Sequence, residues 1–368
     1  MIIMFKKSLQ NLRAYNPGPS VEEIKKMYGL SRVVKLDSNE NVYGASPNVR
    51  KAITMDALLP ELYPDCQDLD LRLELSRRLG PAPQQFLFGT GLDEIIVLIS
   101  RAFLEPGNSI VMAWPTFYEY YCHAQIEGAD TRKVPCRPDG KHDWKAMLQA
   151  IDETTKVVWI CNPNNPTGTY LTKKELDQFI DSVPSNVLVV LDEAYIDFVT
   201  AEDFPNGLDY LNDYENVLVL RTFSKAYGLA SFRIGYAIGS LTVINELDKV
   251  RPPFNNPRLS QVAALAALKD DSFKENCLRK NQEVMAMTTA FLKKKGIRYD
   301  ESQANFIFIR VNEPKQIALI CKQNGFLINP FEDGVRVTLG KMEDMKHFLK
   351  RLESAIDGTS ALVSSKKE

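Results

Sequence analysis

Short apolar segments rich in β-branched residues alternate with amphipathic helical patterns through the middle of the chain, and this alternation most constrains the fold. The apolar segments are NSIVMAW (108–114), TKVVWIC (155–161), NVLVVLD (186–192) and NVLVLRTF (216–223). Between two of them, TKKELDQFIDSV is typical of a helix, with Thr172 and Glu175 as its capping box. Strand–helix–strand repetition predicts an α/β fold whose mostly parallel central sheet is covered by helices on both faces.

The pattern changes near RPPFNNPRLS (251–260), where proline and asparagine interrupt it. Helical sequence follows to about residue 295, and NFIFIRV (305–311) and GVRVTLG (334–340) then flank another amphipathic helix. We therefore expect a large ligand-binding domain over 41–254 and a smaller α+β domain over 255–368. Residues 1–40 are expected to form an N-terminal arm that is part of the smaller domain.

Charge and composition narrow the class of function. The 368 residues include 45 Lys plus Arg and 47 Asp plus Glu, a net charge of −2. This balance gives no electrostatic reason to bind nucleic acid or an acidic membrane, so a small-molecule enzyme is expected. The stretch MIIMFKKSLQ turns basic without a following apolar core. We expect no signal peptide, no membrane span and a cytoplasmic location.

Cysteine and histidine usage argues against a disulfide framework and against a metal site. The six cysteines are dispersed without C-x-x-C spacing, which is typical of a reduced chain. The three histidines, His123, His142 and His347, are not paired at the spacing of metal ligands, so no metal is expected.

Polar loops follow several of the predicted strands. In FLFGTGLDEII (86–96), Gly91 opens a helical pattern, and free N–H groups at such a helix start bind phosphate. A helix cap without a ligand explains the same residues. The loop is not a dinucleotide fingerprint, because Glu94 replaces its third glycine. In CNPNNPTGTY (161–170), two Asn-Pro steps and a Thr-Gly constrain the loop and hold Asn165 at a fixed point.

Two further segments carry candidate chemistry. Asp192 ends an apolar strand, where a carboxylate is costly without a cationic partner, and Tyr195 lies just beyond it. In RTFSKAYGLASFRIGY (221–236), Lys225 is either a surface lysine or an amine whose pKa is lowered by burial. Thr222, Ser224 and Arg233 supply groups suited to a phosphate dianion. An amine, a carboxylate and a phosphate site together match the needs of pyridoxal phosphate.

The motifs NPNNPTG, DEAY and TFSKAYGLASFRIGY, in this order, resemble those of fold-type I pyridoxal-phosphate aminotransferases of classes I and II. LDSNENVYG (36–44), YPD (63–65), GTGLDE, WPTF (114–117) and VRVTLG narrow the resemblance to histidinol-phosphate aminotransferases. The resemblance runs from about residue 10 to about residue 350. It implies a homodimer that moves an amino group between L-glutamate/2-oxoglutarate and histidinol phosphate/imidazole acetol phosphate, in histidine biosynthesis.

The resemblance also implies a role for individual residues. Lys225 would carry the cofactor as a Schiff base and move protons, and Asp192 would pair with its pyridine nitrogen. Asn165 and Tyr195 would bind the ring hydroxyl, and Phe117 would stack on the ring. The phosphate would be held by Thr222, Ser224, Arg233 and the backbone of Gly91, Leu92 and Asp93. Tyr63 would reach the phosphate of the neighbouring subunit. The substrate would be bound by Asn39, Asn165 and Arg336. Of these, Arg336 would clamp the substrate carboxylate.

One segment departs from the family pattern. In GFLINPFEDGVRVTLG (325–340), Asn329 stands where an arginine that binds the substrate phosphate is expected, and the loop is shortened. An aromatic or other amino acid is therefore an alternative substrate. A decarboxylase acting on a phosphorylated amino acid and a non-catalytic pyridoxal-phosphate-binding regulatory module are further alternatives. A nicotinamide dehydrogenase is disfavoured by the missing glycine fingerprint and by Lys225.

Overall fold

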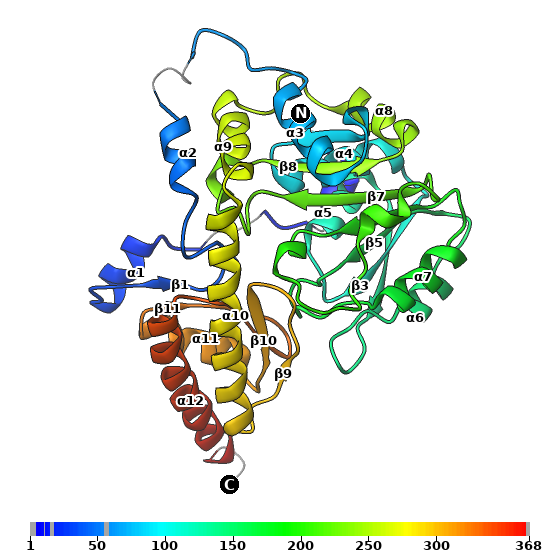
Figure 1. The fold of residues 1–368 in the computed structure, drawn as a ribbon. Helices are drawn as coiled ribbons and strands as arrows, with labels where there is room; N and C mark the ends of the chain where they lie inside the picture. Colours follow the sequence, from blue (N-terminus) through cyan, green and yellow to red (C-terminus); the bar gives the residue numbers. More distant parts are fainter. Residues whose placement is uncertain (1–4, 11, 15–17, 55–58, 366–368) are drawn as a thin grey trace, which may run out of the picture.

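The computed structural model describes residues 5–10, 12–14, 18–54 and 59–365. The expectation of no signal peptide falls partly on residues 1–4, which lie outside the described residues. Figure 1 shows a large lobe (residues 69–250) built on one sheet and a small lobe (residues 297–365) built on another. The helix α10 (Asp271–Lys294) leads from the large lobe into the small one.

The sheet of the large lobe has seven strands in the order β2-β8-β7-β6-β5-β3-β4. Their bounds are Phe86–Gly89 (β2), Ser109–Trp114 (β3), Asp130–Pro135 (β4), Thr155–Cys161 (β5), Leu188–Asp192 (β6), Val217–Thr222 (β7) and Gly235–Gly239 (β8). Only β8 is antiparallel to its neighbours, β2 and β7, and the remaining pairs are parallel. The predicted α/β fold with a mostly parallel central sheet is confirmed.

Helices cover both faces of this sheet, as the apolar strand sequences predict. On one face lie α4 (Gly91–Phe103), α5 (Glu119–Glu127) and α8 (Leu241–Val250), which pack on Trp159 and Val190. On the other face lie α3 (Leu69–Leu79), α6 (Trp144–Gln149), α7 (Lys173–Ser182) and α9 (Arg258–Leu268), which pack with Val158 and Val189. The predicted capping box of α7 is present, because the Thr172 hydroxyl accepts from Glu175 N.

The small lobe holds an antiparallel four-stranded sheet in the order β12-β13-β10-β9. Its elements are β9 (Tyr299–Asp300), β10 (Phe306–Arg310), α11 (Pro314–Gln323), β11 (Phe326–Leu327), β12 (Asn329–Pro330), β13 (Gly334–Thr338) and α12 (Met342–Ser365). Near the N-terminus, β1 (Val34–Lys35) pairs in parallel with β11 and so attaches the start of the chain to this lobe. The domain boundaries at 40/41 and 254/255 stay predictions.

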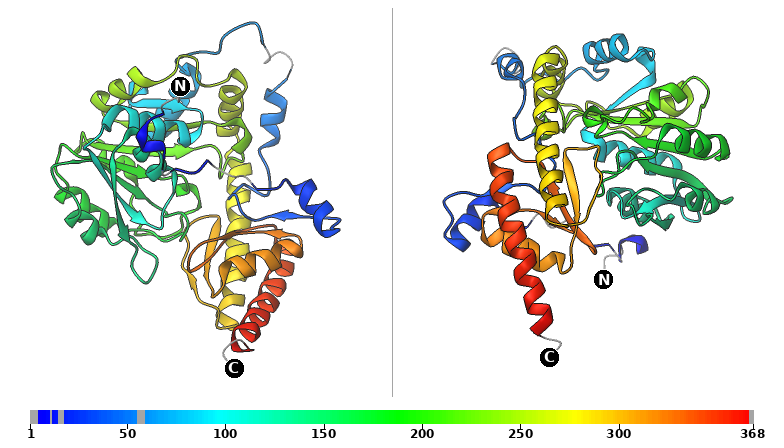
Figure 2. Two further views of the ribbon diagram at one scale, coloured as in Figure 1. Left: turned by 180° about the vertical axis from the view of Figure 1, so that it is seen from behind. Right: turned by 60° about the horizontal axis from the view of Figure 1, so that its bottom comes forward.

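The remaining elements are short. The helices α1 (Val21–Tyr28) and α2 (Pro47–Ala52) lie beside the small lobe and beside α9 respectively (Figures 1 and 2). Single 3₁₀ turns cover Lys7–Leu9, Pro83–Gln85, Ile196–Phe198, Gly207–Tyr210 and Ala230–Phe232. Within the described part of the chain, no helix combines the length and the apolar character that crossing a membrane requires.

Candidate active site

The candidate site lies at the carboxyl ends of the adjacent parallel strands β5, β6 and β7. Asn165 follows β5, Asp192 is the last residue of β6, and Lys225 lies three residues after the end of β7. Parallel strands end at the same edge of a sheet, so these segments, distant in sequence, are brought to one edge. Residues 37–39 and the strand β13 of the small lobe approach the same edge.

Lys225 contacts backbone and aromatic groups rather than a carboxylate. Its Nζ donates to the carbonyl oxygen of Ser38 at 3.2 Å and lies 5.7 Å from the centre of the Tyr195 ring. Burial, with a smaller contribution from the Arg336 cation, lowers the pKa of Lys225 to about 8. Near neutral pH the amine is therefore much closer to its nucleophilic form than an ordinary lysine.

Asp192 is buried, with 3% of its surface exposed. Its Oδ1 accepts from Ala194 N at 3.0 Å, and its Oδ2 accepts from the Tyr120 hydroxyl at 2.5 Å. Burial raises the pKa of Asp192 to about 6, and the Tyr120 hydrogen bond opposes that rise. Tyr120 is not recognisable as a site residue from the sequence, because nothing in FYEYYCHA distinguishes its role from that of a core aromatic.

Tyr195 and Asn39 form a second buried pair. The Tyr195 hydroxyl accepts from Asn39 Nδ2 at 3.0 Å. Asn39 has a positive φ of 55°, and its backbone N–H and Oδ1 both bond to the Thr338 hydroxyl, at 2.9 and 3.0 Å. Burial raises the pKa of Tyr195, so its phenol stays protonated and remains a donor to a further acceptor. Sequence reasoning did not identify Thr338.

Arg336 connects the small lobe to the loop after β5. Its Nη1 donates to Asn165 Oδ1 at 2.5 Å, and its Nη2 donates to the carbonyl oxygen of Asp37. Arg336 is 8% exposed, and its Nε has no hydrogen-bond partner among the described residues. Because an unpaired buried donor is costly, this guanidinium has both charge and bonding capacity left for an anionic ligand.

The residues predicted to hold a phosphate gather at the start of α4. Gly91 has a φ of +76°, and a Cβ there would lie 2.6 Å from Arg233 Nη2. Arg233 Nη2 donates to Asp93 at 2.9 Å, and Ser224 N donates to the Thr222 hydroxyl at 3.1 Å. A helix N-terminus, a guanidinium and hydroxyls at one place are the groups that bind a phosphate dianion. The Leu92 side chain packs in the apolar core, which leaves its backbone for such a ligand.

Phe117 and Tyr63 differ in their surroundings. Phe117 is partly buried, and its ring lies nearly perpendicular to the Tyr120 ring with centres 5.6 Å apart. Tyr63 lies on the surface with 77% of its area exposed, and its ring stacks on Phe254 at 4.6 Å. Within the single chain, Tyr63 is therefore not gathered into the buried cluster around Lys225.

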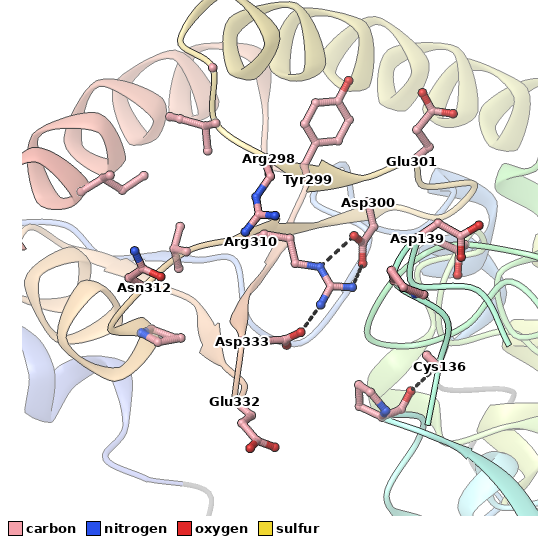
Figure 3. Close-up of a pocket in the computed structure, with 18 of the residues that line it drawn as sticks. Cys136, Asp139, Arg298, Tyr299, Asp300, Glu301, Arg310, Asn312, Glu332 and Asp333 are labelled. Atoms are coloured by element: carbon pink, nitrogen blue, oxygen red, sulfur yellow. Dashed lines mark hydrogen bonds and ion pairs between the residues drawn. The ribbon is translucent and has the colours of Figure 1, made fainter. Parts of the chain in front are cut away.

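A groove of about 1900 Å³ between the lobes is distinct from this cluster, since none of the predicted site residues lines it (Figure 3). Two of its three arginines are paired, Arg310 with Asp300 and Asp333 and Arg137 with Asp139 and Glu175, and the third is Arg298. Within the described ranges, no group of three or more His, Cys, Asp or Glu side chains is placed to hold a metal ion.

Comparison with known proteins identifies the family of the chain and agrees with its fold. The family model described as aminotransferase class I and II matches residues 31–352, and the chain belongs to this family. Histidinol-phosphate aminotransferase 1 of Bacillus anthracis is 47% identical over 358 residues, which are 96% of each chain. Histidinol-phosphate aminotransferase of Geobacillus thermodenitrificans is 45% identical over 344 residues, 92% of this chain and 94% of that one.

The solved structures give the same result. The crystal structure of histidinol-phosphate aminotransferase from Sinorhizobium meliloti in complex with pyridoxal-5'-phosphate matches with a TM-score of 0.88 at 26% identity. The match covers 98% of this chain and 99% of that one. The predicted resemblance, and with it the prediction of an aminotransferase, is confirmed.

Proposed function

We propose that this chain is a histidinol-phosphate aminotransferase that uses pyridoxal phosphate. The observation that carries the proposal is the 47% identity to a protein of that name across 96% of both chains. Identity of this extent includes both lobes, so it covers the loops at the strand ends as well as the core. The amino donor and acceptor pair is L-glutamate and 2-oxoglutarate.

The residues at the sheet edge fit pyridoxal phosphate. Lys225 has a lowered pKa, and no carboxylate among the described residues is hydrogen-bonded to its amine. Asp192 is a buried carboxyl, and Gly91 leaves room beside Arg233. The cofactor requires an amine, a carboxylate for its ring nitrogen and a phosphate cradle, and these features provide all three. When bound, it supplies an aldehyde that takes the amino group and a ring that withdraws electrons from the bonds at Cα.

We assign the following roles to the chain's own groups. Lys225 would hold the cofactor covalently and, as a free amine, would move the proton of the substrate Cα. Asp192 would hold the ring nitrogen as an ionised carboxylate, and Asn165 and Tyr195 would bind the ring hydroxyl. Phe117 stacks on the ring. The phosphate is held by Thr222, Ser224, Arg233 and the backbone N–H groups of Gly91, Leu92 and Asp93.

Substrate binding is assigned to Arg336, Asn165 and Asn39. The free Nε and the charge of Arg336 suit the carboxylate of glutamate. Each half-reaction leaves the site ready for the second substrate, so the kinetics are ping-pong. We further propose a cytoplasmic homodimer, in which the exposed Tyr63 reaches the cofactor phosphate of the partner subunit.

Asn329 bears on the choice of substrate. It pairs across the sheet with Arg336, and its Nδ2 donates to the Asp37 carbonyl at 2.7 Å, the same oxygen that Arg336 contacts. Asn329 therefore supports Arg336 instead of providing a second guanidinium. Two other arginines that could supply positive charge are already paired, Arg310 with Asp300 and Asp333, and Arg251 with Asp248.

A half-reaction panel tests the proposal. Purified protein loaded with pyridoxal phosphate is mixed separately with histidinol phosphate, L-glutamate and aromatic amino acids, and the change in cofactor absorbance is followed. We expect histidinol phosphate and glutamate to convert the bound cofactor to its amine form fastest. Faster conversion by aromatic amino acids would favour that alternative substrate, and carbon dioxide release without a keto acid would favour a decarboxylase. A cofactor that binds but never turns over would favour a regulatory module.

A further inference from the structure

Tyr120 lies beneath the candidate site, in the first turn of α5. It is fully buried, and its ring stacks on Trp159 of β5 with centres 4.2 Å apart and planes 9° apart. The Phe117 ring lies nearly perpendicular to it, with ring centres 5.6 Å apart. These contacts fix the ring between α5 and the sheet, so the position of its hydroxyl is determined by the core.

The hydroxyl is placed against the end of β6. Tyr120 Oη lies 2.5 Å from Asp192 Oδ2, and the other carboxylate oxygen accepts from Ala194 N at 3.0 Å. Burial raises the pKa of Tyr120 well above its ordinary value, so the phenol stays protonated and donates a hydrogen bond to the carboxylate. Each oxygen of Asp192 thus receives one hydrogen bond, and the plane of the carboxylate is fixed.

The other groups near Asp192 do little to stabilise its charge. Asp93 from α4 and the adjacent Glu193 are acidic and raise its pKa. Cys161 at the end of β5 and Tyr195 are neutral, because burial raises the pKa of both. Hydrogen bonds to a charged group are stronger than those between neutral groups, so the Tyr120 hydroxyl is the side-chain contact that favours the ionised carboxylate.

We propose that Tyr120 is a positioning residue, which keeps Asp192 ionised and directs its carboxylate at the ring nitrogen of pyridoxal phosphate. This inference rests on the proposed function, since it concerns how the chain binds that cofactor. The inference gives the ring and the hydroxyl of Tyr120 different roles. The ring packs the core, whereas the hydroxyl acts through Asp192 on the cofactor.

The variant Tyr120→Phe tests this separation, because it retains the ring stack on Trp159 and removes only the hydroxyl. The matched control is Tyr121→Phe, which removes a hydroxyl from the next residue of α5, whose ring contacts Lys133. In full-length protein we expect Tyr120→Phe to bind pyridoxal phosphate about tenfold more weakly, as for loss of a hydrogen bond to a charged group. We expect Tyr121→Phe to bind it as the wild type does.

A spectroscopic measurement distinguishes positioning from packing. The absorbance of the bound cofactor is titrated with pH in the wild type and in each variant. Without the Tyr120 hydroxyl, Asp192 is ionised less readily and stabilises the protonated ring nitrogen less. A ring that withdraws fewer electrons leaves the Schiff base with Lys225 more basic, so the midpoint for loss of the Schiff-base proton should move upward by about half a pH unit in Tyr120→Phe. Substitution of Tyr120 by 3-fluorotyrosine keeps the fold and makes the hydroxyl a stronger donor, so the midpoint should move downward.

The outcomes that overturn the inference are distinct from those that overturn the proposed function. If the wild type binds no pyridoxal phosphate, the proposed function fails and this inference fails with it. If the wild type binds it and both Tyr120 substitutions leave affinity and midpoint unchanged, only the role of Tyr120 fails. Combining Tyr120→Phe with Asp192→Asn gives a further test, because the effect of Tyr120→Phe should disappear when no carboxylate is present. Additive effects of the two substitutions would overturn the inference.

Discussion

Arg336 Nη1 donates a hydrogen bond to Asn165 Oδ1 at 2.5 Å, and this contact joins strand β13 of the small lobe to the loop after β5 of the large lobe. The two residues are separated by 171 positions in the chain. The contact places a substrate-binding candidate beside a cofactor-binding candidate. A substitution that breaks this contact is therefore expected to affect the binding of both the substrate and the cofactor.

Arg336→Lys should weaken substrate binding, because lysine cannot form the same planar pair of contacts to a carboxylate. We expect KM for glutamate to rise about a hundredfold with a smaller change in kcat, measured by steady-state kinetics. The matched control is Arg310→Lys, which changes an arginine on the neighbouring strand β10 that is paired with Asp300. An unchanged KM in Arg336→Lys would remove Arg336 from the substrate site.

Asn329→Ala should weaken substrate binding indirectly, through its effect on Arg336. The substitution removes the hydrogen bond from Asn329 Nδ2 to the Asp37 carbonyl, so Arg336 loses its neighbour at that oxygen. Loss of one ordinary hydrogen bond corresponds to about fivefold, which we expect as an increase in KM for glutamate. Asn329→Arg is the informative companion variant. If Asn329 stands in place of a phosphate contact, the new guanidinium should lower KM for histidinol phosphate but not for glutamate.

Gly228→Ala should be far more destabilising than a change at an ordinary glycine of similar conformation. Gly228 has a φ of +70°, and a Cβ there would lie 2.2 Å from the carbonyl oxygen of Gly44, a backbone atom that cannot rotate away. Gly296 has a φ of +66° with nothing within 4 Å of the added Cβ, so Gly296→Ala isolates the conformational cost, about 1 kcal/mol. Chemical denaturation should give a distinctly larger loss for Gly228→Ala. Equal losses would contradict the close approach.

Lys225 should make the stability of the cofactor-free protein depend on pH. Its pKa is lowered to about 8 in the folded chain, below the ordinary value of 10.5, so the folded state binds fewer protons between these values. The free energy of unfolding should therefore rise with pH through this window, by up to about 1.4 kcal/mol per unit. The cost of burying the amine is fully present below pH 8.

The variant Lys225→Met isolates this contribution, because it removes the titrating group and keeps a chain of similar length. We expect the difference in free energy of unfolding between Lys225→Met and the wild type to be largest near pH 7 and to shrink toward pH 10.5. Urea denaturation at a series of pH values gives this difference directly. A difference that does not change with pH would show that Lys225 titrates normally.

Local sequence patterns were sufficient to predict the parallel sheet and the segments at the carboxyl ends of its strands, where the candidate site lies. The strands at 155–161 and 188–192 are buried on both faces, and this burial is predicted by their continuous apolar sequences. The antiparallel strand β8 was not predicted, because GYAIG carries no sign of its direction. Direction depends on which neighbours a strand meets, and that is decided by the whole sheet.

Candidate site residues were recognisable wherever a polar group follows an apolar strand. Asp192 and Lys225 are examples, since a charge at such a position is costly without a purpose. The groups that support them were not recognisable. Tyr120 lies 72 positions from Asp192, and Thr338 lies 299 positions from Asn39. An aromatic or a threonine in a helix or strand has the same pattern whether it packs the core or positions a site residue.

The sequence by itself determined the alternation of strands and helices, the order of the motifs and the identity of the groups with chemical potential. These properties follow from burial and from residue type, which are local. The tertiary structure alone decided which groups meet: Asn39 with Tyr195, Arg336 with Asn165, and the Tyr120 hydroxyl with Asp192. Hydrogen bonds require atoms within about 3 Å of each other, and only the packing within and between the two lobes brings such distant segments that close.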